Sequence, residues 1–391
     1  MPPTGTRCQL SRRTRPLSIV ARPHTVVERT WLRVSITGVA ALSCERSANV
    51  TIRDTRIEHA QDGIGIKFDR CHGIRLENVS ISAIAAHGAA LQRPNRCNQP
   101  YNDCDSILGI SSADVLIDSV RLTGASSGVE LQSCPRASVR RLVGTNFLGP
   151  YPRGQCVQFS ESHGAVLDQF ACHNEPQHSW TEDLISVWRS AGVVVRNGLV
   201  DGSNSPTGVC VMFENDHAHA NGGAIENVDC VRQGNGCFSA YPATYLVMLR
   251  TRCGWNTCSG VGGRAPPASG GLMWAAGYPI PNEWEGNDTS DHGGYRAHGV
   301  VVQESEYWAA CNTTRAAQHW ARDADAYSVV DIRERHFKPR KPLELRFCWD
   351  KRLPQHTRLR SGGQVGDHVG GPGRARPGLF LRAGAKTRRM P

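Results

Sequence analysis

The sequence predicts an all-β solenoid, a parallel β-helix, and three observations lead to it. Segments that begin with a small or turn residue and continue as alternating apolar and polar residues recur through the body of the chain. A second short strand usually follows each segment, with turn residues between the two. The intervals leave no room for helices, so each period of about 25 residues holds two strands and their turns.

The recurring segments align on one apolar position. The anchor residues are Val50, Ile74, Val115, Val139, Val166, Val194 and Ile225, and they are separated by 24, 41, 24, 27, 28 and 31 residues. The second strands are expected at 63–68, 128–132, 155–159, 183–188 and 208–213. One coil cannot bury its inward face, whereas stacked coils bury a ladder of Val, Ile and Leu about 4.8 Å apart. A β-sandwich, the competing architecture, would show less regular spacing and Asn-Gly or Asp-Gly hairpins.

Two segments interrupt the repeats. The 41-residue step contains an insertion at about 93–109, which is expected to form an exposed loop. Residues 254–298 are a longer excursion rich in Gly and Trp, and the strand pattern returns at 300–303.

The charges divide the chain into three parts. Residues 1–43 hold 7 Lys and Arg against 1 acidic residue, and residues 321–391 hold 17 against 7, which leaves 21 against 27 in 44–320. We expect the β-helix domain at 44–320. A basic N-terminal segment, disordered or targeting, precedes it, and a basic low-complexity C-terminal tail follows it. Because the basic pI comes from the ends, we expect no nucleic-acid partner. The sequence contains no apolar run of about 18 residues, so we expect no membrane-spanning helix. We also expect a monomer.

Two motifs resemble a group of right-handed parallel β-helix proteins in the pectin-lyase-like superfamily. They are GPYPRGQCVQF at 149–159 and EDLISVW at 182–188. The similarity covers about 45–315, and its most specific part is 149–214. It implies a single-stranded right-handed parallel β-helix, which we expect to have about nine or ten coils. The superfamily includes lyases, hydrolases, epimerases, phage tailspikes and adhesins, so the fold does not determine the activity.

Equivalent positions on successive coils stack into rows. This places Gln155 and Asp183 in one row, and it brings Arg153 and Glu182 near one another at the start of the same sheet. Such a groove suits chemistry on a sugar acid. Arg pairs bidentately with a carboxylate, while a protein carboxylate or a bound Ca²⁺ neutralises the uronate and acidifies its C5 proton. Arg or His would then remove that proton.

We therefore expect a lyase-type enzyme that acts on acidic glycans by β-elimination. The expected catalytic residues are Arg153, Glu182, Asp183, Arg189 and His217. The expected substrate-binding residues are Gln158, Glu161, Glu214 and Trp255. A metal ion, with Ca²⁺ as the candidate, would be held by Asp183, Asp216 and His219.

Each of these assignments has a rival. An Arg153–Glu182 ion pair could simply hold the coil register, and the histidines at 217 and 219 could be surface residues without a ligand. Paired carboxylates would also serve a glycoside hydrolase. The third alternative is a non-catalytic glycan-binding or adhesin-like scaffold. In every case we expect the partner to be a polysaccharide or another glycan.

Fifteen cysteines predict disulfides and an oxidising compartment. The pairs Cys97/Cys104, Cys230/Cys237 and Cys253/Cys258 are close enough in sequence to close loops. The remaining strand cysteines, expected as small buried core residues, are Cys71, Cys134, Cys156, Cys172 and Cys210. We expect a secreted or extracellular protein, although no clear signal peptide is present.

Overall fold

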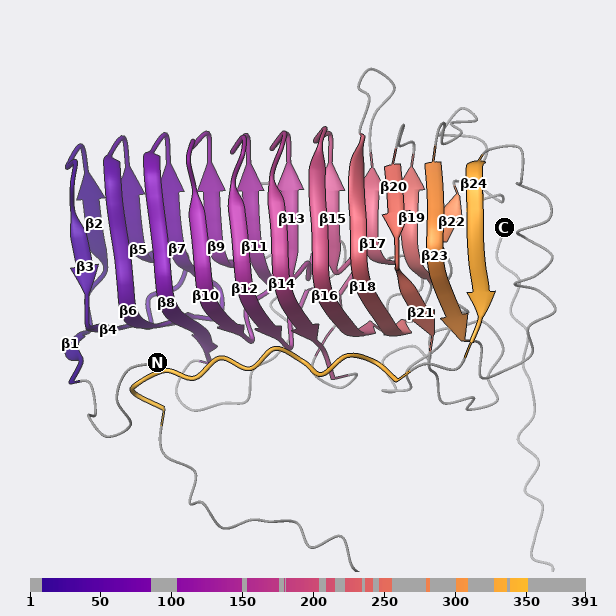
Figure 1. Ribbon diagram of the computed structural model, residues 1–391. Helices are drawn as coiled ribbons and strands as arrows, with labels where there is room; N and C mark the ends of the chain where they lie inside the picture. The colour runs from indigo at the N-terminus through magenta and orange to yellow at the C-terminus, as the bar shows by residue number, and fades with distance from the viewer. Residues whose placement is uncertain are drawn as a thin grey trace, which may run out of the picture. The chain divides into compact units, whose positions relative to one another are not determined.

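The computed structural model shows a solenoid of parallel strands. It describes residues 9–85, 104–149, 153–175, 179, 181–203, 209–214, 222–233, 236–241, 246–254, 279–281, 300–308, 327–335 and 338–350. The chain divides into two compact units, 1–350 and 351–391, and all described residues belong to the first. Two sheets each receive a strand from successive coils, which makes a single right-handed parallel β-helix of about eight turns (Figure 1). The expected fold class is therefore confirmed, and the coil count is close to the nine or ten expected.

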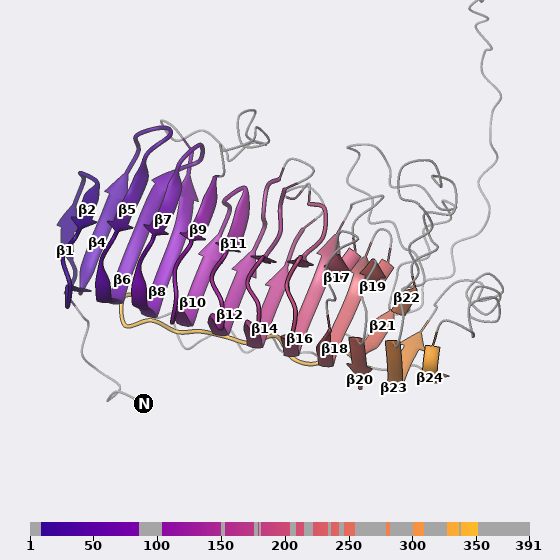
Figure 2. The same ribbon diagram turned by 90° about the horizontal axis from the view of Figure 1, so that it is seen from above.

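The two sheets alternate along the chain. Sheet A, of 14 strands, contains β1 (Ser11–Arg13), β3 (Val26–Glu28), β4 (Thr30–Val34), β6 (Ala48–Ala60), β8 (His72–Ile84), β10 (Leu116–Thr123), β12 (Ser138–Thr145), β14 (Val166–His173), β16 (Val193–Ser203), β18 (Gly223–Gln233), β20 (Leu246–Leu249), β21 (Arg252–Gly254), β23 (Val300–Trp308) and β24 (Tyr327–Glu334). Sheet B, of 10 strands, contains β2 (Leu17–Val20), β5 (Ala40–Glu45), β7 (Ile64–Asp69), β9 (Asp105–Ile110), β11 (Ser127–Gln132), β13 (Val157–Ser160), β15 (Ile185–Trp188), β17 (Val209–Glu214), β19 (Gly236–Tyr241) and β22 (Pro279–Pro281). Viewed from above, the strands follow one another in coil order (Figure 2). None of the described residues forms a helix long and apolar enough to span a membrane.

Stacked apolar side chains fill the interior. One column of sheet A runs through Ile52, Leu76, Ile117, Val139, Leu167, Val195 and Ile225. The facing column of sheet B runs through Leu42, Ile66, Ile107, Val129, Val157, Ile185, Val211 and Phe238. All are almost fully buried. Burying such side chains is what favours stacking, because a lone coil would leave them in water.

Most long strands of sheet A bend at a left-handed residue. This corner has φ between 48° and 58° and stacks Asp54, Asn78, Ser119, Arg141, Gln169, Asn197 and Asn227. Asn and Asp tolerate that conformation better than most L residues. They also bond along the column, since Asn78 Nδ2 donates to Asp54 Oδ1 at 2.5 Å and Asn227 Nδ2 donates to Asn197 Oδ1 at 2.8 Å. The chain thus turns within sheet A without a loop.

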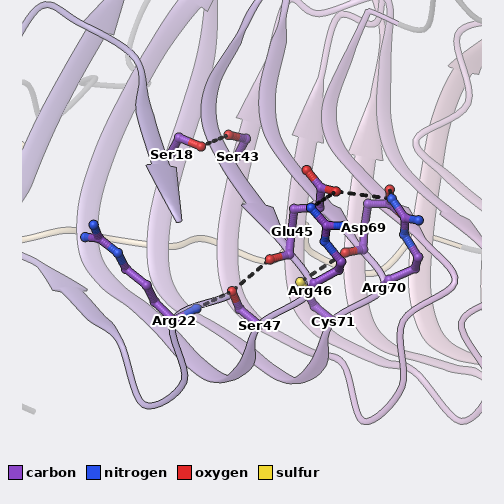
Figure 3. Close-up of polar contacts among 9 residues, drawn as sticks. All are labelled: Ser18, Arg22, Ser43, Glu45, Arg46, Ser47, Asp69, Arg70 and Cys71. Atoms are coloured by element: carbon purple, nitrogen blue, oxygen red, sulfur yellow. Dashed lines mark hydrogen bonds and ion pairs between the residues drawn. The ribbon is translucent and has the colours of Figure 1, made fainter. Parts of the chain in front are cut away.

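A second left-handed corner follows the strands of sheet B. Its members are Ala21, Arg46, Arg70, Ser111, Ser133, Glu161 and Arg189. The residue after each of the last six is a buried Ser or Cys, and these are Ser47, Cys71, Ser112, Cys134, Ser162 and Ser190. Ser47 Oγ, for example, accepts from the Arg22 amide of the preceding coil at 3.1 Å and donates to the Glu45 carbonyl at 2.9 Å (Figure 3). The hydroxyls thus pair backbone groups that a buried turn would otherwise leave unpaired.

The strands extend past both boundaries expected from composition. Strands β1–β4 precede residue 44, and β24 follows residue 320 and pairs with β23. Residues 338–350 are also ordered against sheet A, as hydrogen bonds from Arg340 to Asp229 show. The expected loop at 93–109 is wrong for 105–109, because β9 begins at Asp105 and its residues are buried in sheet B.

Among the described residues, three disulfides join strands across the interior of the solenoid. They join Cys156 to Cys172, Cys210 to Cys230 and Cys237 to Cys253, with Cα–Cα distances of 6.2, 6.2 and 6.0 Å. Each bond links a residue at or just before a sheet B strand to a later strand of sheet A. The predicted pairs Cys230/Cys237 and Cys253/Cys258 are therefore wrong, as is the expectation that Cys156, Cys172 and Cys210 are unbonded core residues. Pairing depends on distance across the interior rather than along the chain.

The remaining cysteines agree better with expectation. Cys71 and Cys134 are buried free thiols, as expected, and so is Cys44. Cys44 Sγ lies 3.1 Å from Cys71 Sγ. Cys104 is disulfide-bonded, and its predicted partner Cys97 lies outside the described residues. Interior disulfides are typical of proteins from oxidising compartments.

Candidate functional site

A row of outward-facing side chains crosses the middle strands of sheet B. It comprises Lys67, Leu108, Glu130, Gln158, Ser186 and Met212 on β7 through β17. Strand alternation turns these side chains away from the core, because the flanking residues Val129 and Leu131 belong to it. Glu130 is nevertheless only 3% exposed. The middle of this outer face is therefore buried, and it holds a carboxylate.

The carboxylate of Glu130 is held from two sides. Gln132 Nε2 donates to Glu130 Oε1 at 2.6 Å, and Arg153 Nη1 lies 3.9 Å from Oε2. The Glu130 side chain is 4% exposed and that of Arg153 is 23% exposed. Removing one member of such a pair would leave an uncompensated charge in a site with little water. Glu130 of the outward row and Arg153 from the turn before β13 thus form a charged pair.

Arg153 is positioned by the turn that precedes β13. The next residue, Gly154, has φ of 105°, and a Cβ there would lie 2.7 Å from the Cα of Thr181. Only glycine fits this position without strain. The Gly154 amide also donates to Ser127 Oγ at 3.1 Å, which joins the turn to β11.

A second polar row lies at the start of sheet B. Gln155 and Asp183 occupy equivalent positions on neighbouring coils, as expected, and Ser127 and Asp105 continue the row toward the N-terminus. All four are at most 5% exposed. Each stands two residues before a core position of sheet B, so strand alternation turns this row toward the interior and not toward the outer face. Asp183 Oδ1 accepts from the Val209 amide at 2.7 Å, so one of its oxygens pairs the first amide of β17. Asp183 thus supports the next coil besides any chemical role.

Arg153 and Glu182 also lie on neighbouring coils, but the backbone makes their contact. The Glu182 amide donates to the Arg153 carbonyl at 3.1 Å. Within the described part of the chain, the ion pair of Arg153 is with Glu130. The described ion pair of Arg153 is therefore directed toward β11.

The residues expected at the end of sheet B occupy its left-handed corner. Glu161 and Arg189 both have positive φ, and Arg189 Nη1 lies 3.7 Å from Glu161 Oε1, with the Arg189 side chain 33% exposed and that of Glu161 51% exposed. Such a surface pair contributes little to stability. The Arg189 guanidinium also stacks over Trp188, 4.0 Å from the ring centroid. Glu214 is the register neighbour of Trp188 on β17.

Four of the predicted site residues cannot be placed. His217, Asp216, His219 and Trp255 lie outside the described residues. Within the described ranges, no group of three or more His, Cys, Asp or Glu side chains is arranged to hold a metal ion.

Sequence reasoning missed Glu130 and Trp188. Both belong to predicted strands, at 128–132 and 183–188, and both stand at outward positions of the alternation. An acid or a tryptophan at an outward position was therefore the available signal. The sequence does not show that Glu130 is covered, which is what distinguishes it from an ordinary surface acid.

The charge of the Glu130–Arg153 pair favours some substrates over others. Glu130 is buried on the outer face, and Arg153 is its paired cation. A polyanion would have to compete with Glu130 for that cation, which disfavours it. A buried carboxylate is also a group that glycoside hydrolysis uses as acid or base.

Comparisons with known proteins give matches among solved structures, at low sequence identity and low TM-score. The sequence matches no protein-family model and no curated protein sequence. Among solved structures, the catalytic domain of GH87 alpha-1,3-glucanase in complex with nigerose is similar at 8% identity and a TM-score of 0.30, over 65% of this chain and 66% of that one. A variant of that catalytic domain in complex with tetrasaccharides is similar at 6% identity and a TM-score of 0.27, with the same coverage. The chain thus spans just under two thirds of these structures.

Proposed function

We propose that the protein is a polysaccharide-active enzyme whose site lies on the outer face of sheet B, around β11, β13 and β15. The observation that carries this proposal is the Glu130 carboxylate, which is buried at an outward position in the middle of the solenoid and pairs with Arg153. Packing of the interior does not require charges there, because the core lies on the other side of the sheet. Rows that repeat about every 4.8 Å present polar groups at regular intervals along an extended chain.

Hydrolysis of a neutral glycan is the reaction that this face supports best. Glu130 would exchange a proton with the glycosidic oxygen or the attacking water. Arg153 would orient Glu130, and Gln158 on the adjacent strand would hydrogen-bond sugar hydroxyls. Arg153 is already paired with Glu130, so an uncharged polymer fits this face better than a uronate polymer.

β-Elimination on an acidic glycan is the second candidate, and the Arg153 guanidinium favours it. This cation would bind the uronate carboxylate. Its existing pairing with Glu130 makes this role weaker than expected from the sequence, because a substrate carboxylate would have to compete with a carboxylate already in place.

The test is cleavage of purified glycans by the full chain. A panel of neutral α- and β-glucans, pectate and alginate, with and without Ca²⁺, would be assayed for new reducing ends and for absorbance near 235 nm. Hydrolysis yields reducing ends alone, whereas elimination also yields the absorbing unsaturated uronate. For the hydrolase, we expect Glu130→Gln to lower kcat at least a hundredfold, because an amide cannot exchange the proton.

The matched control is Glu28→Gln, which removes an exposed carboxylate of sheet A that pairs with Arg53. It should leave kcat unchanged, and circular dichroism should show both variants folded. Full activity in folded Glu130→Gln would refute the site. Absence of cleavage across the panel, with glycan binding retained, would replace the enzyme by a binding scaffold.

A further inference from the structure

The C-terminal part of the first unit forms a strap across the outer face of sheet A. Residues 338–350, here named the strap, run from β18 back to β10 (yellow trace in Figure 1). At one end the Arg340 amide and Nη2 donate to Asp229 at 2.7 and 3.1 Å. At the other end Arg121 bonds Asp350 at 3.2 and 3.1 Å and lies 4.6 Å over the Phe347 ring. The seven steps from 340 to 347, at about 3.3 Å each, suffice to cross four strand spacings of about 4.8 Å.

The β18 anchor of the strap is strong. The Asp229 side chain is fully buried and accepts from Arg252 Nε and Nη2 at 2.7 and 2.6 Å, in addition to Arg340. A buried carboxylate with two guanidinium partners is costly to separate from either. The strap is therefore a built part of the solenoid.

A cavity of about 700 Å³ lies between the strap and β12, β14, β16 and β18. Its size falls in the range of small-molecule sites. The apolar lining residues are Val143, Ala171, Leu199 and Val231 from sheet A and Pro339, Pro342 and Leu343 from the strap. Apolar groups facing unfilled space lack contact partners, so an apolar ligand there would gain dispersion contacts and remove surface from water.

One side of the cavity is polar and cationic. Asp201, Lys338 and Arg340 line it together with His173. The Asp201 carboxylate is already engaged, because Arg232 Nε donates to it and His173 Nδ1 lies 3.2 Å away. Burial acts to raise the pKa of Asp201, but these two partners outweigh it and hold that pKa below its usual value. Asp201 therefore remains an anion balanced by Arg232.

Cationic donors remain at this end. Within the described ranges, Lys338 makes no ion pair or hydrogen bond, and the buried Nε of Arg340 has no hydrogen-bond partner. Arg340 and Arg252 share the single charge of Asp229, which leaves an excess of positive charge around the cavity. A buried donor without a partner costs free energy that an acceptor in the cavity would recover.

We propose that this cavity binds a small amphipathic anion, a monocarboxylate with an aliphatic or aromatic body. The body would lie against Ala171, Leu199 and Leu343, and the carboxylate would lie at Lys338 and Arg340. This site is on sheet A, so it is independent of the function proposed for sheet B.

The test uses decanoate as probe and decanol as its uncharged counterpart, titrated calorimetrically into the full chain. We expect saturable decanoate binding and at least tenfold weaker decanol binding, because only the acid pairs with the cations. Ala171→Phe should abolish decanoate binding by filling the cavity. Its matched control is Val247→Phe, which places the same ring at an exposed site of β20.

Lys338→Gln keeps the proposal testable if the filled variant does not fold. It should weaken decanoate at least threefold and leave decanol unchanged. Lys341→Gln, on the same strap but outside the cavity lining, should change neither. The proposal is overturned if decanoate does not bind, if decanol binds equally well, or if folded Ala171→Phe binds decanoate like the unchanged protein.

Discussion

A buried histidine makes the stability of the solenoid depend on pH. His59 lies on β6 between Val34 and Ala83 of the neighbouring strands and has no exposed surface. Its Nδ1 is 2.9 Å from the Ala60 carbonyl, and its Nε2 has no hydrogen-bond partner among the described residues. Burial lowers the pKa of His59 from 6.5 to about 4, against a smaller opposite effect of the carbonyls of Ala60 and Gly63.

The magnitude follows from proton linkage. The unfolded chain binds the His59 proton near pH 6.5, whereas the folded chain resists it until about pH 4. Below pH 6.5 the unfolded state therefore holds more protons, and stability falls as the pH falls. The contribution is fully present above pH 6.5. About 2 kcal/mol of unfolding free energy is lost between pH 7 and pH 5, and about 3 kcal/mol is lost in full below pH 4.

Urea unfolding followed by tryptophan fluorescence at pH 7, 6 and 5 measures this effect. His59→Leu replaces the ring with an apolar side chain of similar size and removes the titration. The variant should lose about 2 kcal/mol less than the unchanged protein between pH 7 and pH 5. His72→Leu, at an exposed site beside Asp114, is the control and should retain the full pH dependence. The reasoning is refuted if His59→Leu loses as much stability on acidification as the unchanged protein.

Two further predictions concern the strap and the interior. Asp229→Asn removes the charge that Arg252 and Arg340 share. It should therefore lower the unfolding free energy by about 3 kcal/mol or more and speed tryptic cleavage after Arg340. Unchanged stability and cleavage would contradict the role of Asp229 as the anchor of the strap. On the coil between the first two disulfides, Leu184 is in register with Cys156 and Cys210, and Val200 is in register with Cys172 and Cys230. The double variant Leu184→Cys, Val200→Cys should therefore form an additional disulfide. Mass spectrometry checks this as a loss of 2 Da, and two alkylatable thiols at these positions would count against the register.

The candidate site was only partly predictable. The shared row of Gln155 and Asp183 followed from the repeat spacing, because equivalent positions must stack. Glu130 was missed because its importance depends on being covered and on Arg153 reaching it from the next coil. The strap was missed for a different reason. Its alternation of Leu343, Leu345, Phe347 and Trp349 is a strand-like signal, but the basic composition around it favoured disorder.

The sequence by itself determined the solenoid, its two strands per coil and the stacked apolar columns. These features depend on contacts between neighbouring coils, so a local period of alternating residues is sufficient to specify them. Only the tertiary structure decided the disulfide pairs, the partner of Arg153 and the cavity under the strap. Each depends on distances across the interior or between segments far apart in the chain, as between Asp229 and Arg340. Sequence spacing carries no measure of such distances, because the register of the whole stack sets them.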